Sequence, residues 1–110
     1  MITRFALFEG RVAPDQTEAF RAAVLERLVP LWRQFPGASD VRVMFEEARD
    51  AGAPDFPLIL AISYPDVATM EAALDSPARF QSKDVTREIV AEFFKGRIHH
   101  HVTERHEFTG

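Results

Sequence analysis

Four stretches of this chain predict β-strands, in which successive side chains point to opposite faces with a period of two. In the first stretch, Phe5 and Leu7 fall on one face of the predicted strand, while Ile2, Ala6 and Phe8 fall on the other. The third stretch, PLILAISY, is apolar on both faces. The pattern predicts strands at residues 2–12, 41–46, 57–64 and 97–106.

Apolar residues spaced three or four apart predict a long helix between the first two strands. Pro14 to Thr17 supply the turn and cap residues that begin it, and the pattern continues to about Phe35. Pro30 lies inside this helix. Because proline removes one backbone hydrogen bond, we expect it to kink the helix just before Trp32.

Two further helices are predicted between the third and fourth strands. Asp66 is placed to cap a short helix. Ser76 followed by Pro77 starts a longer one, since serine is a favoured cap and proline a favoured first residue. Gly96 suits the left-handed position at which many helices end, so we expect the longer helix to end there.

The resulting order, β-α-β-β-α-β, predicts one ferredoxin-like α+β domain over residues 1–110, with four antiparallel strands and the helices on one face. Those helices can cover only one side of the sheet, yet the first and third strands are apolar on both sides. Each large apolar side chain left in water forgoes about 1.5–3 kcal/mol, against a total stability of about 5–15 kcal/mol for a domain. We therefore expect a homodimer, a dimeric α/β barrel in which two sheets pack face to face.

The composition of the chain limits which kinds of molecule it is expected to bind. The chain has 110 residues, a net charge of −4 and no cysteine. An acidic chain without a basic run disfavours nucleic acid as a partner, and the lack of cysteine excludes disulfides and cysteine-ligated zinc. No apolar run approaches the ~20 residues of a membrane span, and the N-terminal segment lacks the layout of a signal peptide. We expect a cytoplasmic protein that binds neither nucleic acid nor membranes.

The segment from Ile62 to Pro77, ISYPDVATMEAALDSP, is similar to the strand-then-helix signature of EthD-like and stress-responsive A/B-barrel proteins. These belong to the dimeric α/β-barrel superfamily, together with proteins of the antibiotic-biosynthesis-monooxygenase type. The resemblance implies a ligand cleft between the sheet and the two helices of each protomer. The activities it implies are cofactor-independent oxygenation of aromatic polyketides, polyketide cyclisation, haem binding or breakdown, and degradation of small organic molecules. Other members of the group have no known reaction.

The chain departs from the cyclase-like members of this group, which carry histidine on the first strand and near the start of the second helix. Here the first strand has Thr3 and Arg4, and the helix start reads Ser76 to Arg79, so both histidines are missing. Residues that mark haem-degrading relatives are not recognisable either. We expect no cofactor.

The segment RIHHHVTERH places three consecutive histidines on the fourth predicted strand. Side chains on a strand alternate between its faces, so His99 and His101 share one face and His100 points to the other, between Ile98 and Val102. A neutral imidazole on a cleft wall can act as a general base near pH 7. His100 is therefore the candidate catalytic histidine, and the alternative is a core or interface histidine bonded to the backbone.

His99 and His101 raise the question of a metal, because imidazoles two residues apart on a strand can reach one ion. A zinc or iron site needs three or four ligands, or two together with a carboxylate, and Glu46 on the second strand is a conceivable partner. Arg97, on the same face as the pair, would repel a cation. We expect no metal site and assign the pair to a polar edge or a dimer contact.

The remaining candidates are aromatic. Tyr64 ends the third strand, where a phenol can donate a proton or a hydrogen bond to a carbonyl, and Trp32 can line the mouth of the cleft. The alternatives are a surface hydroxyl for Tyr64 and core packing for Trp32. Phe20, Phe80 and Phe93 are candidates for the walls of an apolar ligand pocket, again with core packing as the alternative.

Charged residues give weaker signals. Arg4 and Arg97 can bind an anionic group of a ligand, with surface or dimer salt bridges as the alternative. The carboxylates show no spacing of a glycosidase pair. The chain also lacks the glycine-rich and nucleophile motifs of nucleotide-binding proteins and hydrolases.

These observations predict a homodimer that binds a small apolar or aromatic molecule between its sheet and its helices. If it is an enzyme, we expect a cofactor-independent oxygenase, or a cyclase or isomerase, acting on an aromatic or polyketide-like compound. His100 is then the acid/base and Tyr64 the group that polarises an oxygen. The alternative is a non-catalytic ligand-binding or stress-associated dimer whose cleft is filled by its own phenylalanines.

Overall fold

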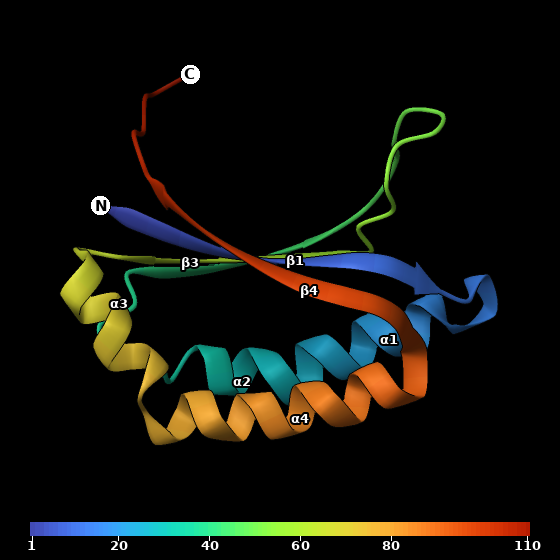
Figure 1. The fold of residues 1–110 in the computed structure, drawn as a ribbon, viewed down its shortest axis with the longest axis horizontal. Coiled ribbons are helices and arrows are strands. Elements are labelled where there is room, and N and C mark those ends of the chain that lie inside the picture. Colours follow the sequence, from blue (N-terminus) through green and yellow to red (C-terminus); the bar gives the residue numbers. More distant parts are fainter.

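The computed structural model describes all residues, 1–110, and is built around one four-stranded antiparallel sheet with the strand order β2-β3-β1-β4 (Figure 1). All four predicted strands are present. The last one begins at Phe94, earlier than predicted. The strands are β1 (Ile2–Val12), β2 (Asp40–Phe45), β3 (Leu58–Tyr64) and β4 (Phe94–Glu104).

All the helices pack against one face of this sheet (Figure 1). None of them is both long enough and apolar enough to cross a lipid bilayer. The element order and the placement of the helices confirm the predicted ferredoxin-like α+β fold. The helical segments are η1 (Pro14–Gln16), α1 (Thr17–Ala23), η2 (Val24–Leu28), α2 (Val29–Trp32), α3 (Val67–Leu74) and α4 (Pro77–Phe93).

Pro30 is accommodated by a wide π-helical turn, η2, directly before it. The backbone N–H of Val29 donates to the carbonyl of Val24, five residues back instead of four. Proline has no N–H to donate, and its ring crowds the carbonyl four residues before it, so a wider turn gives the ring room. The helical run ends at Trp32, short of the predicted Phe35, although Phe35 is buried.

Both predicted caps of the second helical region are confirmed. A side-chain oxygen of Asp66 accepts from the backbone N–H of Thr69 at 2.8 Å and so begins α3. The hydroxyl of Ser76 accepts from the backbone N–H of Arg79 at 3.3 Å and begins α4, with Pro77 in its first turn. Each cap satisfies a backbone donor that the helix itself leaves free, and thereby fixes where the helix starts.

The prediction that Gly96 ends α4 is wrong. The helix ends at Phe93, and Gly96 lies inside β4, directly opposite Gly10 of β1. The two backbones approach closely at this point: a Cβ atom on Gly10 would lie 2.7 Å from the Cα of Gly96, nearer than real side chains come. Glycine is therefore needed here for contact between two strands and not for a helix end.

The core lies between the sheet and the helices. Large apolar side chains from the inner faces of β1 and β3 meet apolar side chains from α1, η2 and α4. The most deeply buried include Phe8, Leu58, Val24, Leu28 and Ile89.

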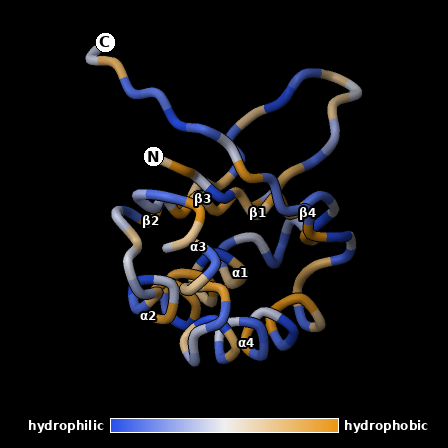
Figure 2. The backbone as a smooth tube through the Cα atoms, turned by 60° about the vertical axis from the view of Figure 1, so that its left-hand side comes forward, coloured by the Kyte–Doolittle hydropathy of each residue, from blue (hydrophilic) through white to orange (hydrophobic).

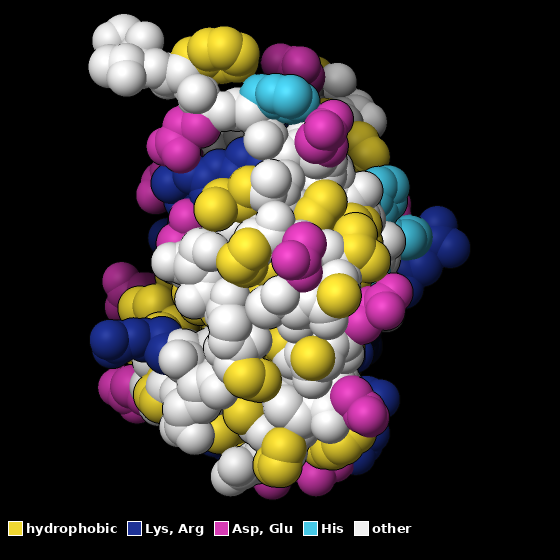
Figure 3. All heavy atoms as spheres, turned by 90° about the vertical axis from the view of Figure 1, so that its left-hand side faces the viewer, with side chains coloured by type: hydrophobic (Ala, Val, Ile, Leu, Met, Phe, Trp, Pro, Cys, Tyr) yellow, Lys and Arg dark blue, Asp and Glu magenta, His cyan; other side chains and the backbone are white.

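The opposite face of the sheet carries no helix, and β1 and β3 are apolar there too, as predicted. Phe5, Leu7 and Ile59 lie together on this outer face, with Leu7 paired to Ile59, and all three are only partly buried. The β2–β3 loop and the C-terminal tail both rise on this side, and the tail is largely hydrophilic (Figure 1, Figure 2). Seen from one end, the tail projects from a surface on which hydrophobic side chains alternate with charges of both signs (Figure 3).

Replacing Gly96 with alanine is expected to lower the free energy of unfolding by about 2 kcal/mol or more, because the new methyl group must push β4 away from β1. Urea unfolding followed by circular dichroism measures this loss. Gly52→Ala is the matched control: its Cβ meets nothing within 4 Å, so only its positive φ of 82° costs free energy, about 1 kcal/mol. Equal losses in the two variants would contradict the role assigned to the close strand contact.

Candidate functional site

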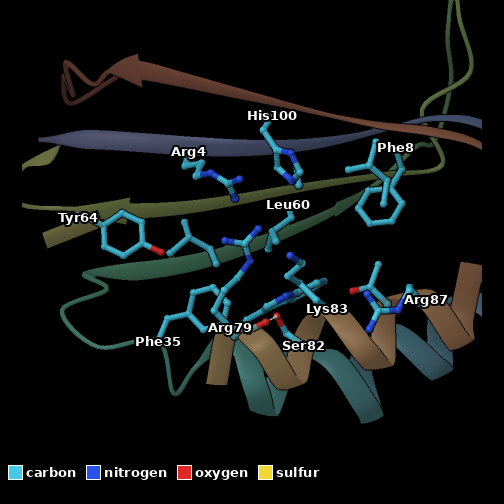
Figure 4. Close-up of a pocket in the computed structure, with 15 residues that line it drawn as sticks. Arg4, Phe8, Phe35, Leu60, Tyr64, Arg79, Ser82, Lys83, Arg87 and His100 are labelled. Atoms are coloured by element: carbon cyan, nitrogen blue, oxygen red, sulfur yellow. Dashed lines mark hydrogen bonds between the residues drawn. The ribbon is translucent and has the colours of Figure 1, made fainter. Parts of the chain in front are cut away.

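A cavity of about 230 Å³ lies between the inner face of the sheet and helix α4 (Figure 4). Its walls combine apolar side chains with several polar and charged ones. Trp32, predicted to line the cleft, is in the wall and is almost fully buried. The apolar walls come from Phe8, Trp32, Phe35, Leu60, Ile62 and Ile98.

The sheet contributes three polar side chains to this cavity: Arg4 from β1, Tyr64 from the end of β3 and His100 from β4. They share the inner face because the register pairs Ala6 with His100 and Arg4 with Ile62, so even-numbered residues of these strands point to the helices. His100 therefore points to the opposite face from His99 and His101, as the alternation in the sequence predicts. Figure 4 shows the Arg4 guanidinium and the His100 imidazole pointing from the sheet into the cavity.

Helix α4 contributes the opposite wall. Arg79, Lys83 and Arg87, spaced by four residues, line the cavity together with Ser82 and Thr86. Figure 4 shows Arg79 and Lys83 extending toward the sheet, whereas Arg87 pairs with Asp84 on its own helix. Sequence reasoning missed these three cations. A signal was present: the apolar stripe of α4 gives way toward the helix start to Ser82 and Arg79, and a core-facing stripe that turns polar is typical of a helix lining a cavity.

The electrostatic surroundings keep His100 neutral. Burial, and then the positive charges of Arg4 and Arg79 with a smaller effect of His99, lower the pKa of the His100 imidazole from 6.5 to about 4. His100 lies on an edge strand, and the residue as a whole is exposed to solvent although its side chain borders the cavity. At pH 7 the ring is therefore uncharged and has a nitrogen free to accept a proton.

Tyr64 is buried, with 1% of its surface exposed, which removes the alternative of a surface hydroxyl. Burial raises the pKa of its phenol, while the nearby guanidinium groups of Arg4 and Arg79 act in the opposite direction. The phenol is thus protonated at neutral pH and can donate a hydrogen bond into the cavity.

The phenylalanines named from the sequence lie elsewhere. Phe20 and Phe93 pack edge to face, with ring centroids 6.2 Å apart, at the other end of the helix layer. Phe80 sits on α4 and is half exposed. None of the three lines the cavity. The spacing of apolar residues identifies the apolar face of a helix. It carries no information about where along that face a cavity lies.

His99 and His101 lie on the outer face, opposite Leu7 and Phe5 respectively. The Nε2 atom of His99 is 2.8 Å from a carboxylate oxygen of Glu9, and Arg97 approaches the same oxygen at 3.8 Å. Arg97 is therefore paired on the outer face and is not part of the cavity.

Glu46, weighed as a further metal ligand, follows β2, which is at the opposite edge of the sheet from β4. It accepts hydrogen bonds from the backbone N–H of Phe56 and from Arg49 instead. No group of three or more histidine, cysteine, aspartate or glutamate side chains converges in the structure.

Comparison with known proteins supports the fold. No family model matches the sequence, and no curated protein matches it either. Solved structures do match over almost the whole chain. An EthD-family protein from Bacillus halodurans superposes with a TM-score of 0.77 at 21% identity, covering 96% of this chain and 99% of its own.

Two further structures show the range of these neighbours. A dimeric ferredoxin-like protein from Bacteroides fragilis gives a TM-score of 0.67 at 13% identity, covering 94% of this chain and 95% of its own. SnoaB, a cofactor-independent oxygenase from Streptomyces nogalater, gives 0.62 at 16% identity, covering 97% and 94%. At these identities the likeness shows the fold alone. The resemblance noted for the segment from Ile62 to Pro77 is thus confirmed at the level of the fold, which is shared by EthD-family and antibiotic-biosynthesis-monooxygenase-like proteins.

Nuclear magnetic resonance of the histidine rings is expected to show His100 titrating with a midpoint of about pH 4. Arg4→Met should raise this midpoint, because the guanidinium no longer opposes a second positive charge. Arg97→Met, on the outer face, is the matched control and should leave it unchanged. A midpoint unaffected by the loss of Arg4 would show that the cation does not act on the imidazole.

The same shift predicts how stability depends on pH. The unfolded chain takes up a proton at His100 near pH 6.5, whereas the folded protein does so only near pH 4. The unfolded state therefore binds more protons in this interval, and the free energy of unfolding falls as the pH is lowered from 6.5 to 4. His100→Gln should remove this part of the slope, as measured by urea unfolding at a series of pH values. An identical slope in the variant would rule out the contribution of His100.

Proposed function

We propose that the cavity binds a small aromatic or polyketide-like molecule and that His100 acts on it as a general base. The observation that carries this proposal is a neutral imidazole projecting into a largely apolar cavity whose wall also holds a protonated phenol, on the far side of Arg4 (Figure 4). Together these two groups can take a proton from one atom of a ligand and donate a hydrogen bond to another.

The size of the cavity supports a ligand of one or two rings. An apolar cavity of about 150 Å³ in another protein holds benzene, and the cavity here is about 230 Å³. The rings of Phe8, Trp32 and Phe35 offer flat apolar surface on which such a molecule can pack. These three rings leave the cavity open, so the alternative of a cleft filled by the protein's own phenylalanines loses support.

The chemistry that fits is removal of a proton from a carbon or hydroxyl activated by a neighbouring carbonyl. His100 accepts the proton, and the Tyr64 hydroxyl donates to the carbonyl oxygen, where negative charge develops. The resulting enolate can be reprotonated at another atom, which is isomerisation, or can attack within the molecule, which is cyclisation. With molecular oxygen as co-substrate, the same electron-rich intermediate can be oxygenated without a cofactor, the activity stated for SnoaB.

The proposal predicts that the protein accelerates exchange of the acidic C–H protons of 2-tetralone or anthrone with deuterium oxide, measured by proton nuclear magnetic resonance. His100→Gln should reduce this acceleration by about 10²-fold or more, since a positioned base contributes about 10²–10⁴-fold. Tyr64→Phe should reduce it less, because it removes a donor and leaves the base.

Trp32 fluorescence, titrated with the same compounds, separates binding from catalysis, because Trp32 lies in the cavity wall. Saturable quenching in both wild type and His100→Gln, with exchange lost only in the variant, supports the general base. Quenching without any His100-dependent exchange would contradict the catalytic proposal and support a non-catalytic ligand-binding protein.

We further propose that the protein is a homodimer joined through the outer faces of its two sheets. Phe5, Leu7 and Ile59 are only partly buried in a single chain, at the centre of a sheet face that no helix covers. Burying each such side chain fully contributes about 1.5–3 kcal/mol. Two of the structural neighbours, from Bacteroides fragilis and Thermobifida fusca, are described as dimeric ferredoxin-like proteins.

The dimer is tested by Leu7→Glu, which places a charge at the centre of the outer face and should give a folded monomer by sedimentation velocity at micromolar concentration. Leu25→Glu is the matched control, because Leu25 is half exposed on the helix layer. This variant should remain dimeric. A monomeric wild type, or a Leu7→Glu variant that stays dimeric, would contradict the proposed interface.

A further inference from the structure

Every charged side chain in the wall of the cavity is a cation. Arg4 comes from β1, and Arg79, Lys83 and Arg87 come from α4, whereas no aspartate or glutamate lines the cavity. The chain as a whole has 17 acidic residues against 13 lysines and arginines. A wall of four cations without a carboxylate is therefore a local feature that runs against the overall charge.

Three of the four cations in the cavity wall have no ion-pair partner in the chain. Arg4, Arg79 and Lys83 take part in no ion pair, and Arg87 pairs only with Asp84 on its own helix. Burial, and then the positive charge of Arg79, lower the pKa of the Arg4 guanidinium, while Tyr64 acts in the opposite direction. A partly buried charge is normally paired, because leaving water costs free energy that a partner offsets.

Arg105, on the outer face of the same sheet, shows the usual arrangement. Its guanidinium donates to Asp40 at 2.7 Å, to Glu107 at 2.9 Å and to Ser63 at 3.1 Å. These contacts raise the pKa of Arg105, the hydrogen bond with Asp40 most of all. The chain thus pairs one arginine of this sheet with two carboxylates and leaves another, Arg4, to face a second arginine across a cavity.

The two unpaired guanidinium groups approach the same space from opposite walls. Figure 4 shows Arg4 extending down from the sheet and Arg79 extending up from α4, with the Tyr64 ring beside them and His100 between Arg4 and the Phe8 end of the cavity. Both arginines act on the pKa values of Tyr64 and His100. The proposed base therefore lies between a cationic end and an apolar end.

Building on the proposed function, we propose that the ligand is an organic acid whose carboxylate, or an equivalent anionic group, lies between the guanidinium groups of Arg4 and Arg79. The ring of this acid packs against Phe8, Trp32 and Leu60. A guanidinium presents a planar fork of donors that matches a carboxylate, and an anion between two of them replaces their mutual repulsion with two attractions.

Lys83 and Arg87 follow Arg79 along the same face of α4, and both residues are exposed to solvent. They extend the positive potential from the anion site toward the rest of the cavity. When His100 removes a proton, negative charge develops on the ligand, and fixed cations in a partly desolvated site stabilise it. They also attract an organic anion to a protein whose net charge is −4.

The experiment compares two ligands of the same shape, 2-naphthoate and the neutral 2-naphthamide, by isothermal titration calorimetry. The wild-type protein should bind the carboxylate at least about tenfold more tightly. Arg4→Met and Arg79→Met should each abolish most of this preference while leaving the affinity for the amide nearly unchanged. Arg97→Met, on the outer face, is the matched control and should keep the full preference.

Two more readouts distinguish a binding role from a structural one. Binding of 2-naphthoate, and not of 2-naphthamide, should raise the pH midpoint of His100, because the anion offsets the charges of Arg4 and Arg79. Arg4→Met should unfold at the same or a higher urea concentration than wild type, since it removes an unpaired charge and leaves a side chain of similar length. A destabilised Arg4→Met protein would count against the assignment.

The outcomes separate this inference from the proposed function. Equal binding of the acid and the amide, or a preference that survives both arginine substitutions, overturns the anion site even when His100-dependent exchange of neutral ketones is observed. An arginine-dependent preference for the acid in a protein that shows no His100-dependent exchange supports the anion site and rejects the general base. Failure of both ligands to bind overturns the inference.

Discussion

The register of the antiparallel sheet is the constraint on which both faces of this protein depend. Side chains on a strand alternate between faces, so a slip of one residue would exchange the inner and outer sets completely. The contact of Gly10 with Gly96 holds β4 against β1 where no side chain fits between them. That pairing directs His100 into the cavity and its two neighbouring histidines to the outer face.

The cavity on the inner face of the sheet lies where helix α4 no longer presents apolar side chains to the sheet. Along α4, Ile89 is buried in the core, whereas Ser82 and Arg79 lie nearer the helix start and border the cavity. Long cationic side chains extend from a helix without filling the space beneath it with apolar atoms. The cavity and its charge therefore have one cause, the change of α4 from an apolar to a cationic inner stripe, and both bear on His100 through burial and positive charge.

The outer face is organised differently, because charges beside its apolar centre are paired within the chain. Arg105 is held by Asp40, and His99 lies against Glu9, around a centre of apolar side chains from β1 and β3. Paired charges at the rim and apolar side chains at the centre suit contact with another protein surface. Unpaired cations around an open space suit a small anion. The two faces of one sheet thus present two kinds of binding surface.

The sequence by itself determined the four strands, the caps at Asp66 and Ser76, and the side of the sheet to which His100 points, because these follow from local chemistry and a fixed period of two. It did not determine that Gly96 contacts another strand, since that contact joins residues far apart in the chain. Nor did it locate the cavity: Phe20 and Phe93 share an apolar face with the core, and only packing decides which end of the helix layer is filled. The partnership of Arg4 with Arg79 is likewise tertiary, because it depends on the distance between a strand and a helix that are joined only through the rest of the fold.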